Sequence, residues 1–455
     1  MKATLKTLLP WIAGATLTRD AEFDGVTTDS RAVAEGNLFI ALRGERFDAH
    51  DFLPQVAAHK VAGIVAEKLP EECDVPSLIV PNTRTALGQI GTGWRRQFAL
   101  PLIGVTGSNG KTTVKEMIAA ILQAAFGADA CMATRGNFNN DIGVPLTLMR
   151  LQSAHRAAVI ELGMNHPGEI AQLAAMASPT VGLVNNAQRE HQEFMASVEA
   201  VAIENGSVLK ALSSDGVAVF PADDEFTPLW RDYATHCRSM TFGFSDDADV
   251  RCTHVANVFG SDLQVTANGH SFRVELSAAG VHNVRNALAA IACTLAIGIS
   301  VEAIVRGLQA FAPVNGRLQR KTATNGALVI DDTYNANPDS VRAAIDVLSQ
   351  VAAPRVLVLG DMGEVGNDGP RYHEEVGAYA RERGIDRLLA LGELTVHTTQ
   401  AFGQGAAHYD SVDQLNQALD TFFNNEATAL VKGSRFMKME RVVQHLLGQH
   451  HQEGH

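Results

Sequence analysis

The sequence contains few cysteines, and they are not arranged for a disulfide framework or a zinc site. The five residues, Cys73, Cys131, Cys237, Cys252 and Cys293, are scattered along the chain without a Cys-x-x-Cys pair. Isolated thiols of this kind are typical of small core residues in proteins of a reducing compartment. We therefore predict reduced cysteines and a cytoplasmic location.

Long apolar runs and an excess of basic residues are also missing. The longest apolar run, from Ala287 to Ile299, is shorter than the ~20 residues that a membrane-spanning helix needs. The formal net charge of −13 disfavours a surface that coats nucleic acid but is compatible with a local basic groove for a small anion. These absences predict a protein that acts on small molecules, without membrane insertion or nucleic-acid binding.

The order of β-rich and helical segments predicts an α/β protein with three domains. At 455 residues, the chain exceeds what one hydrophobic core usually serves. Short β-rich runs and one helix predict a small α/β domain at 1–99. Strands separated by helical segments predict a central domain with a mostly parallel sheet at 100–313. Four apolar strands alternating with helices predict a doubly wound, Rossmann-like domain at 314–455.

The stretch GVTGSNGKTT, residues 104–113, is the most informative motif. It follows an apolar run that predicts a buried strand, and it precedes VKEMIAAILQAAF, whose apolar residues recur at helical spacing. In a strand–turn–helix unit, glycines and the helix N-terminus turn amides toward a phosphate, a lysine neutralises it, and a hydroxyl ligates Mg²⁺. Val105 takes the first glycine position of the usual GxxxxGK[ST] pattern. We predict ATP binding rather than a chance turn, through Gly107, Ser108, Asn109, Gly110, Lys111, Thr112 and Thr113.

Polar residues follow two further predicted strands of the central domain. Glu161 ends one strand and His191 follows another. Strand ends on one edge of a parallel sheet converge, so these side chains and Thr112 are predicted to hold a cation between ATP and a second substrate. Either residue alone is more typical of a helix cap or a surface position.

Later segments add candidates for the ATP site. Asn283 and Asn286 begin a predicted helix, where their amides either cap locally or suit the edge of an adenine. Arg317 lies at the second domain boundary and either reaches a transferring phosphoryl group or is a plain surface residue. Asp331 and Asp332 follow an apolar run, which is costly unless a positive group or a hydroxyl-rich ligand meets one of them. A polar rim on one cleft is predicted from Asp361, Glu364, Lys432, Ser434 and Arg435.

Taken together, these segments resemble the Mur ligases, the ATP-dependent amide-bond-forming enzymes of peptidoglycan precursor synthesis. Over nearly the whole length, TGSNGKTT, ELGMNHPGEI, GVHNVRNALAA, GRL and IDDTYNANP occur in the family's order and approximate spacing. The runs GNFNNDIGVP, DDTYNANPDS, LGDMGEVG and VKGSRFMKM resemble the branch that adds D-alanyl-D-alanine. The ligase that adds the third peptide residue has a Tyr-Ala-His-Thr-Pro-like run where this chain has Tyr334 to Pro338.

The resemblance implies a three-domain ligase that uses ATP and Mg²⁺ to join D-alanyl-D-alanine to UDP-MurNAc-tripeptide through an acyl phosphate. It implies a UDP-sugar-binding N-terminal domain, a central ATPase and a closing C-terminal domain, and we expect a monomer. The implied catalytic residues are Lys111, Glu161, His191 and Arg317, and the metal ligands are Thr112, Glu161 and His191. ATP contacts are expected at Asn283, Asn286, Arg317 and Asp332, and substrate contacts at Ser30, Arg31, Asn137, Asn139, Asn335 and Asn337.

One position departs from the family pattern. Many members have a lysine in an Ala-Lys-Gly-Glu-like run, and its carbamate helps to organise the second metal; this chain has Asn205 there. An amide cannot form a carbamate, so we expect activity without added bicarbonate, with Glu204 or water in its place or a weaker second metal.

Two other functions stay open on the sequence. One is a neighbouring ligase of the same architecture, either the earlier peptidoglycan ligase or a folylpolyglutamate-type synthetase. The other is a P-loop switch that signals rather than catalyses, which leaves the acidic strand ends of the third domain unexplained.

Overall fold

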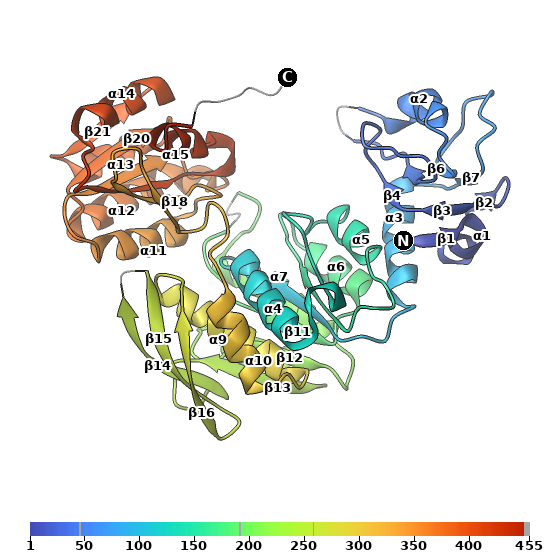
Figure 1. The fold of residues 1–455 in the computed structure, drawn as a ribbon, viewed down its shortest axis with the longest axis horizontal. Coiled ribbons are helices and arrows are strands. Elements are labelled where there is room, and N and C mark those ends of the chain that lie inside the picture. Colours follow the sequence, from blue (N-terminus) through green and yellow to red (C-terminus); the bar gives the residue numbers. More distant parts are fainter. Residues whose placement is uncertain (45–46, 191–192, 258, 450–455) are drawn as a thin grey trace.

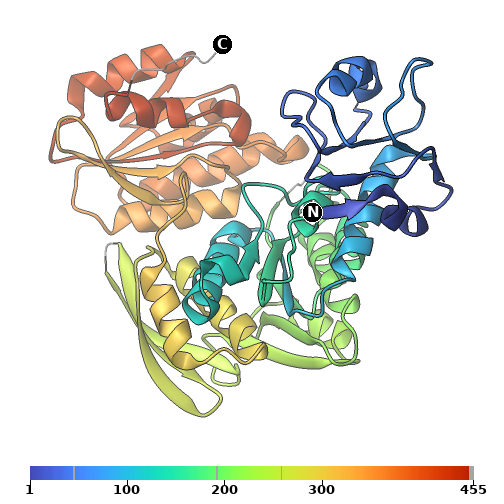
Figure 2. The same cartoon turned by 45° about the vertical axis from the view of Figure 1, so that its right-hand side comes forward.

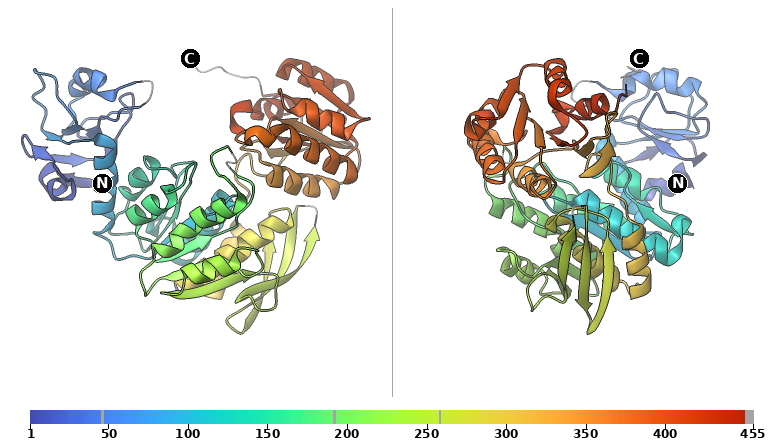
Figure 3. Two further views of the ribbon diagram at one scale, coloured as in Figure 1. Left: turned by 180° about the vertical axis from the view of Figure 1, so that it is seen from behind. Right: turned by 60° about the vertical axis from the view of Figure 1, so that its left-hand side comes forward.

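The structure is a computed structural model that describes residues 1–44, 47–190, 193–257 and 259–449. These residues form three α/β domains, and the predicted fold class is confirmed. Figures 1 and 3 show the N-terminal and C-terminal domains on opposite sides above the central domain. In the described part of the chain, no helix combines the length and the apolar character needed to cross a bilayer.

The N-terminal domain contains a small sheet with the order β2-β7-β6-β5-β4, parallel except for β2, and a separate β1-β3 pair. Helix α3 extends from this domain and packs on α5 and α6 of the central domain (Figure 2). The elements are β1 (Lys2–Thr4), α1 (Leu5–Leu8), β2 (Thr16–Leu17), β3 (Glu22–Asp24), β4 (Val26–Thr27), β5 (Leu38–Ile40), α2 (Leu53–Ala58), β6 (Gly63–Ala66), β7 (Ser77–Ile79) and α3 (Thr83–Arg95).

The central domain is built on a nine-stranded sheet with the order β16-β15-β14-β13-β12-β11-β8-β10-β9. It is parallel from β9 to β14, and β14 to β16 extend it as antiparallel hairpins. The elements are β8 (Leu102–Thr106), α4 (Lys111–Phe126), β9 (Cys131–Ala133), α5 (Gly143–Leu148), β10 (Ala157–Glu161), α6 (Glu169–Ala177), β11 (Val181–Val184), α7 (Val198–Lys210), β12 (Val217–Pro221), α8 (Thr227–Tyr233), β13 (Arg238–Gly243), β14 (Val250–Asn257), β15 (Gly260–Ala267), β16 (His270–Leu276), α9 (Val281–Ala296) and α10 (Val301–Ala310).

Both faces of this sheet are covered, which explains why its central strands are apolar throughout. In β8, Ile103 and Val105 pack with α4, α9 and α10, whereas Leu102 packs on the other face with α5, α6 and α7. All five residues of β8 are buried. A strand buried on both faces reads as a continuous apolar run rather than as an alternation.

The C-terminal domain has a six-stranded sheet with the order β17-β18-β22-β19-β20-β21, in which β17 is antiparallel. Helices α11 to α13 cover one face, and α14 and α15 cover the other. The elements are β17 (Gln319–Thr322), β18 (Leu328–Asp332), α11 (Pro338–Ser349), β19 (Arg355–Gly360), α12 (Gly369–Glu382), β20 (Arg387–Leu391), α13 (Thr395–Phe402), β21 (Ala406–Tyr409), α14 (Val412–Phe422), β22 (Thr428–Lys432) and α15 (Glu440–Leu446).

The sheet order brings the polar strand ends together. Strands β10 and β11 pair in parallel with β8 on either side, so the segments after these three strands leave the same edge. In the C-terminal domain, β18 and β22 are parallel neighbours, and Asp332 lies opposite Lys432. Both edges contribute residues to one cavity.

Candidate functional site

A cavity of about 830 Å³ lies between the central and C-terminal domains. The residues between β8 and α4, the ends of β10 and β18, and the first turns of α9 and α11 line it. Arg84 of the N-terminal domain lies at its edge and forms an ion pair with Asp141 of the central domain. The cavity is therefore assembled from all three domains.

The backbone amides of the phosphate loop, residues 107–113, fall into two groups, those with an acceptor and those without one. The amides of Gly107, Ser108 and Asn109 donate to the Asn205 side chain, the Asn186 carbonyl and the Asn186 side chain. Among the described residues, the four amides of 110–113 have no acceptor, and α4 begins without a side-chain cap. Open amides at the positive end of a sixteen-residue helix are suited to binding an anion.

Glycine is required at the end of this loop. Gly110 has a φ of 81°, in the left-handed region. A Cβ atom there would lie 2.5 Å from Asn286 Oδ1 and 2.9 Å from Asn185 Nδ2. The asparagines form a chain in which Asn185 donates to Asn286 at 2.9 Å and Asn286 donates to Asn283 at 3.0 Å. Asn286 therefore lies against Gly110 of the loop, and Asn283 holds Asn286 in place. Both asparagines also line the cavity.

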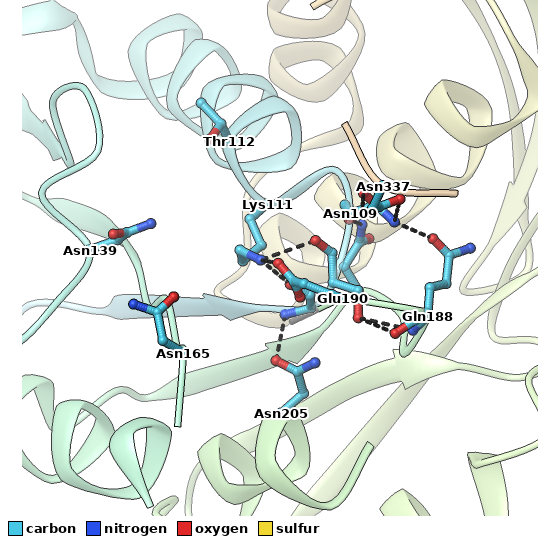
Figure 4. Close-up of polar contacts among 12 residues, drawn as sticks. Asn109, Lys111, Thr112, Asn139, Asn165, Gln188, Glu190, Asn205 and Asn337 are labelled. Atoms are coloured by element: carbon cyan, nitrogen blue, oxygen red, sulfur yellow. Dashed lines mark hydrogen bonds and ion pairs between the residues drawn. The ribbon is translucent and has the colours of Figure 1, made fainter. Parts of the chain in front are cut away.

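Lys111 points into the cavity, where a carboxylate meets its ammonium group. Its Nζ donates to Glu190 Oε1 at 2.8 Å and to the carbonyl oxygens of Gly107 and Ser108 (Figure 4). The side chains of Lys111 and Glu190 are 14% and 13% exposed. A triphosphate that binds this loop competes with Glu190 for the lysine.

The Thr112 hydroxyl forms hydrogen bonds with two other predicted residues, Glu161 and Arg317. It donates to Glu161 Oε2 at 3.0 Å and accepts from Arg317 Nη2 at 2.9 Å. The other oxygen of Glu161 accepts from Asn139 Nδ2 at 2.9 Å, so this buried carboxylate is held by two neutral donors. Carboxylate and hydroxyl oxygens are the ligands that Mg²⁺ prefers, so this pair fits the cation. In the described residues, no cluster of three His, Cys, Asp or Glu side chains forms a metal site, and His191 lies outside these residues.

Arg317 reaches this point from the segment between the two domains. Its guanidinium carbon lies 4.2 Å from the centre of the Tyr334 ring. Its Nε is buried without an acceptor in the described chain. A stacked guanidinium with a spare donor beside Thr112 is suited to a phosphate oxygen.

The two adjacent aspartates each meet a lysine, as their burial requires. Asp331 pairs with Lys321 at 2.7 Å, and Asp332 pairs with Lys432 at 2.6 Å. Asp332 also accepts from the amide of Leu318 at 3.1 Å. Burial raises the pKa of Asp332, and Lys432 opposes this effect. Both carboxyl oxygens of Asp332 therefore hold the start of the C-terminal domain in place.

Among the remaining predicted contacts, two asparagines of the C-terminal domain line the cavity. Asn337 caps α11 and donates to Asn109 Oδ1 at 2.9 Å, which links the phosphate loop to the C-terminal domain. Asn335 accepts the amide of its neighbour Ala336. Asn137 and Arg31 are exposed and Ser30 is half-buried, and all three lie outside the cavity lining. Arg31 pairs with Asp29 at 2.8 Å.

The predicted polar rim is largely wrong. Lys432 lines the cavity, but Asp361 accepts the amides of Leu394 and Thr395 and serves α13. Ser434 is buried and accepts the amide of Gly363. Asp361, Glu364, Ser434 and Arg435 are all absent from the lining in the described residues. Acidic and hydroxyl side chains at these strand ends cap neighbouring segments instead.

Asn205, at the position of the family's lysine, serves the phosphate loop. Its Oδ1 accepts the Gly107 amide at 3.0 Å, its carbonyl accepts the Thr106 hydroxyl at 3.1 Å, and it is 1% exposed. Glu204 accepts the amides of Gly168 and Ile170 at the start of α6. Because both its oxygens are used there, Glu204 is not placed to replace a carbamate.

Several cavity residues were not predicted from the sequence: Arg84, Asn185, Gln188, Glu190 and His282. Burial, with a contribution from Lys432, lowers the pKa of His282 to about 4, so its imidazole is neutral at pH 7. Gln188 and Glu190 lie in the segment after β11, and the convergence of strand ends that singled out Glu161 is the signal that also applies to this segment.

Comparisons with known proteins agree with this architecture. The Mur ligase middle domain matches residues 105–294, the glutamate ligase domain of Mur ligases matches 316–435, and the Mur ligase family catalytic domain matches 22–95.

Full-length relatives show the same likeness. UDP-N-acetylmuramoyl-tripeptide–D-alanyl-D-alanine ligase of Escherichia coli K12 is 37% identical, over 98% of each chain. A crystal structure of MurF from Acinetobacter baumannii has a TM-score of 0.92 at 35% identity, over 98% of this chain and 99% of that one. The structure of MurF ligase from Thermotoga maritima in complex with ADP has a TM-score of 0.84 at 25% identity, over 93% and 97%. With likeness over nearly its whole length, the chain belongs to the Mur ligase family.

Proposed function

We propose that this protein joins D-alanyl-D-alanine to UDP-MurNAc-tripeptide at the expense of ATP, releasing ADP and phosphate. The observation that carries the proposal is the convergence of the open amides of 110–113, Lys111 and Arg317 on one cavity between domains. The relatives named above support the choice of substrates, because the Escherichia coli protein is named for this ligation. The ADP complex of the Thermotoga maritima protein supports the nucleotide.

The chemistry follows from the poor reactivity of a carboxylate toward an amine at neutral pH. An oxygen of the tripeptide's terminal carboxylate attacks the γ-phosphorus, and the bond to the ADP oxygen breaks, which gives an acyl phosphate. The amine of D-alanyl-D-alanine then attacks the acyl carbon, loses a proton, and expels inorganic phosphate. The released phosphate thus carries one oxygen of the former carboxylate.

The residues of this chain contribute charge and position rather than covalent chemistry. Carboxylate and γ-phosphate are both anions, so their approach requires cations on the transferring group. In this proposal, Lys111 leaves Glu190 for the phosphates, and Arg317 turns its buried Nε and its Nη2 toward the γ-phosphate. The amides of Gly110 to Thr113 bind the remaining phosphate oxygens.

Mg²⁺ is the second part of the proposal. The oxygens of Thr112 and Glu161 would hold it, and Asn139 would keep Glu161 oriented. Bound there, the ion would neutralise charge on the phosphate groups. The proposed role of His191 as a further ligand follows from the family resemblance.

The sugar nucleotide and the dipeptide are assigned to the outer domains. Ser30 and Arg31 are proposed to meet the uridine side, and Asn137 and Asn139 the peptide side. Asn335 and Asn337 are proposed to contact the dipeptide from the C-terminal domain, with Asn283, Asn286 and Asp332 near the nucleotide. The domain limits 1–99, 100–313 and 314–455, a monomeric state and a cytoplasmic location stay predictions.

The test is phosphate release by the purified protein with ATP, Mg²⁺ and UDP-MurNAc-tripeptide, with and without D-alanyl-D-alanine. The proposal predicts release that depends on both substrates. Release with meso-diaminopimelate, lysine or glutamate in place of the dipeptide would assign the chain to a neighbouring ligase activity instead.

A further inference from the structure

The three residues 188–190 connect the phosphate loop with the C-terminal domain. Gln188 donates its amide to Ser108 Oγ at 2.9 Å and accepts from Asn109 Nδ2 at 2.6 Å. Glu190 accepts from Lys111. Figure 4 shows Gln188 and Glu190 directed at the loop, with Asn337 of the C-terminal domain on the far side of Asn109. The residue between them, Arg189, makes its contacts elsewhere.

Arg189 forms a charged fork with two helices of the C-terminal domain. Its amide donates to Asp339 Oδ2 at 3.0 Å and its Nη2 to Asp339 Oδ1 at 2.5 Å, in the first turn of α11. Its Nη1 donates to Glu375 Oε2 on α12 at 2.7 Å, and its guanidinium lies 5.3 Å from the Tyr372 ring. The Arg189 side chain is 22% exposed, and partial burial strengthens such charge-assisted hydrogen bonds.

The acidic partners keep this fork charged at neutral pH. Burial lowers the pKa of Arg189, but its hydrogen bonds to Asp339 and Glu375 outweigh this effect and raise the pKa above its ordinary value. The hydrogen bond from Arg189 in turn lowers the pKa of Glu375. Both shifts favour the ionised forms of Arg189 and Glu375.

The fork holds a wall of the cavity. Asn337, Asp339 and Ser340, at the start of α11, all line it. Two neutral contacts accompany the fork across the same boundary, Asn109 with Asn337 and the amide of Glu193 with the carbonyl of Glu364. Loss of Arg189 thus removes the ion pairs to Asp339 and Glu375 from this seam, while these two neutral hydrogen bonds remain.

We propose that Arg189 is a positioning residue that seats the C-terminal domain over the cavity and couples this seating to occupation of the phosphate loop. A phosphate that binds Lys111 breaks the ion pair between Lys111 and Glu190. Glu190 is the next residue after Arg189, so this change alters the segment that carries Arg189. A nucleotide that changes this segment therefore changes how α11 is held against the central domain. Because thermodynamic coupling is reciprocal, the position of α11 also changes the affinity for the nucleotide. The kinetic part of the test rests on the proposed ligation, but the structural part does not.

The experiment compares Arg189→Ala and Arg189→Lys with a matched control, Arg342→Ala. Arg342 also donates to Glu375, at 2.8 Å, but both of these residues belong to the C-terminal domain. Removing Arg342 therefore deletes a similar charged contact without opening the seam. Hydrogen exchange is measured by mass spectrometry on the full chain, with and without ADP and Mg²⁺.

In the wild type and Arg342→Ala, we expect ADP to slow exchange both in α4 and at the start of α11. In Arg189→Ala, α4 should still respond while the response of α11 is lost, and Arg189→Lys should recover part of it. We also expect Arg189→Ala to lower kcat/KM for D-alanyl-D-alanine by about 10- to 100-fold, the loss typical of a partly buried charge-assisted contact, and Arg342→Ala to stay within about threefold.

An α11 response in Arg189→Ala equal to that in Arg342→Ala would overturn the proposal, as would equal kinetic effects of the two substitutions. A wild-type protein that releases no phosphate with D-alanyl-D-alanine would instead contradict the proposed function. The exchange comparison would then still decide the role of Arg189.

Discussion

The pair Lys111 and Glu190 gives a prediction that separates folding from catalysis. A lysine exposed on a loop is removed at little cost in stability, but the Lys111 side chain is 14% exposed and faces a carboxylate that is 13% exposed. Lys111→Ala removes the ammonium group from that carboxylate. We expect a loss of about 3 kcal/mol in the free energy of unfolding, the lower end of the values for broken buried pairs.

The double variant Lys111→Ala, Glu190→Gln removes both charges. Since the glutamine no longer needs a counter-charge, we expect most of the lost stability to return in urea unfolding, with a coupling energy of about 1–2 kcal/mol in the double-mutant cycle. Ligation should not return, because the phosphates still lack their lysine. We expect phosphate release to fall about 10²- to 10³-fold in both variants, as for the loss of one preorganised donor to a transition-state oxyanion.

The two assays give distinct refutations. If the double variant ligates as fast as the wild type, Lys111 serves to neutralise Glu190 and does not act on the phosphates. If Lys111→Ala is as stable as the wild type, the ion pair contributes nothing to the fold, and the expected loss of unfolding free energy is refuted.

Three further predictions concern two residues that line the cavity and one that supports the phosphate loop. Glu161→Gln keeps an acceptor for Thr112 but removes the charge, so we expect the Mg²⁺ concentration for half-maximal activity to rise about tenfold in a magnesium titration; no change would exclude Glu161 as a ligand. His282 has a pKa of about 4, below the 6.5 of a free imidazole, so its contribution to stability is complete above pH 6.5 and is lost as the pH falls toward 4. His282→Asn should therefore reduce the loss of unfolding free energy between pH 7.5 and pH 5 by about 1–2 kcal/mol, and equal losses would contradict the lowered pKa of this group. Because Asn205 binds the Gly107 amide, activity should be the same in bicarbonate-free and bicarbonate-supplemented buffer, and a bicarbonate-dependent rate would overturn this reading.

Local sequence patterns predict the elements of this fold well where burial on both faces leaves no ambiguity. The apolar run before the phosphate loop corresponds to β8, and the helical pattern after Lys111 corresponds to α4. The cost of two adjacent buried acids also leads correctly to positive partners for Asp331 and Asp332. Lys432 as the partner of Asp332 depends on the pairing of β18 with β22, which a local pattern does not reveal.

The errors and omissions arise where one side chain has several uses. The sequence indicates that Asp361 follows a strand, but not that its Oδ1 accepts hydrogen bonds from the amides at the start of α13. It indicates that Asn205 is uncharged, but not that it binds Gly107. Glu190 and Arg189 lie after a strand end, without periodicity, and their partners come from other segments of the chain. Tertiary contacts between domains decide these positions.

The central claim is that the γ-phosphoryl group of ATP passes to the peptide's carboxylate before the amine attacks. The most direct test uses UDP-MurNAc-tripeptide whose terminal carboxylate is labelled with ¹⁸O, together with unlabelled ATP and D-alanyl-D-alanine. We expect the released phosphate to carry one ¹⁸O atom for each peptide bond formed. Ligated product accompanied by unlabelled phosphate would contradict it.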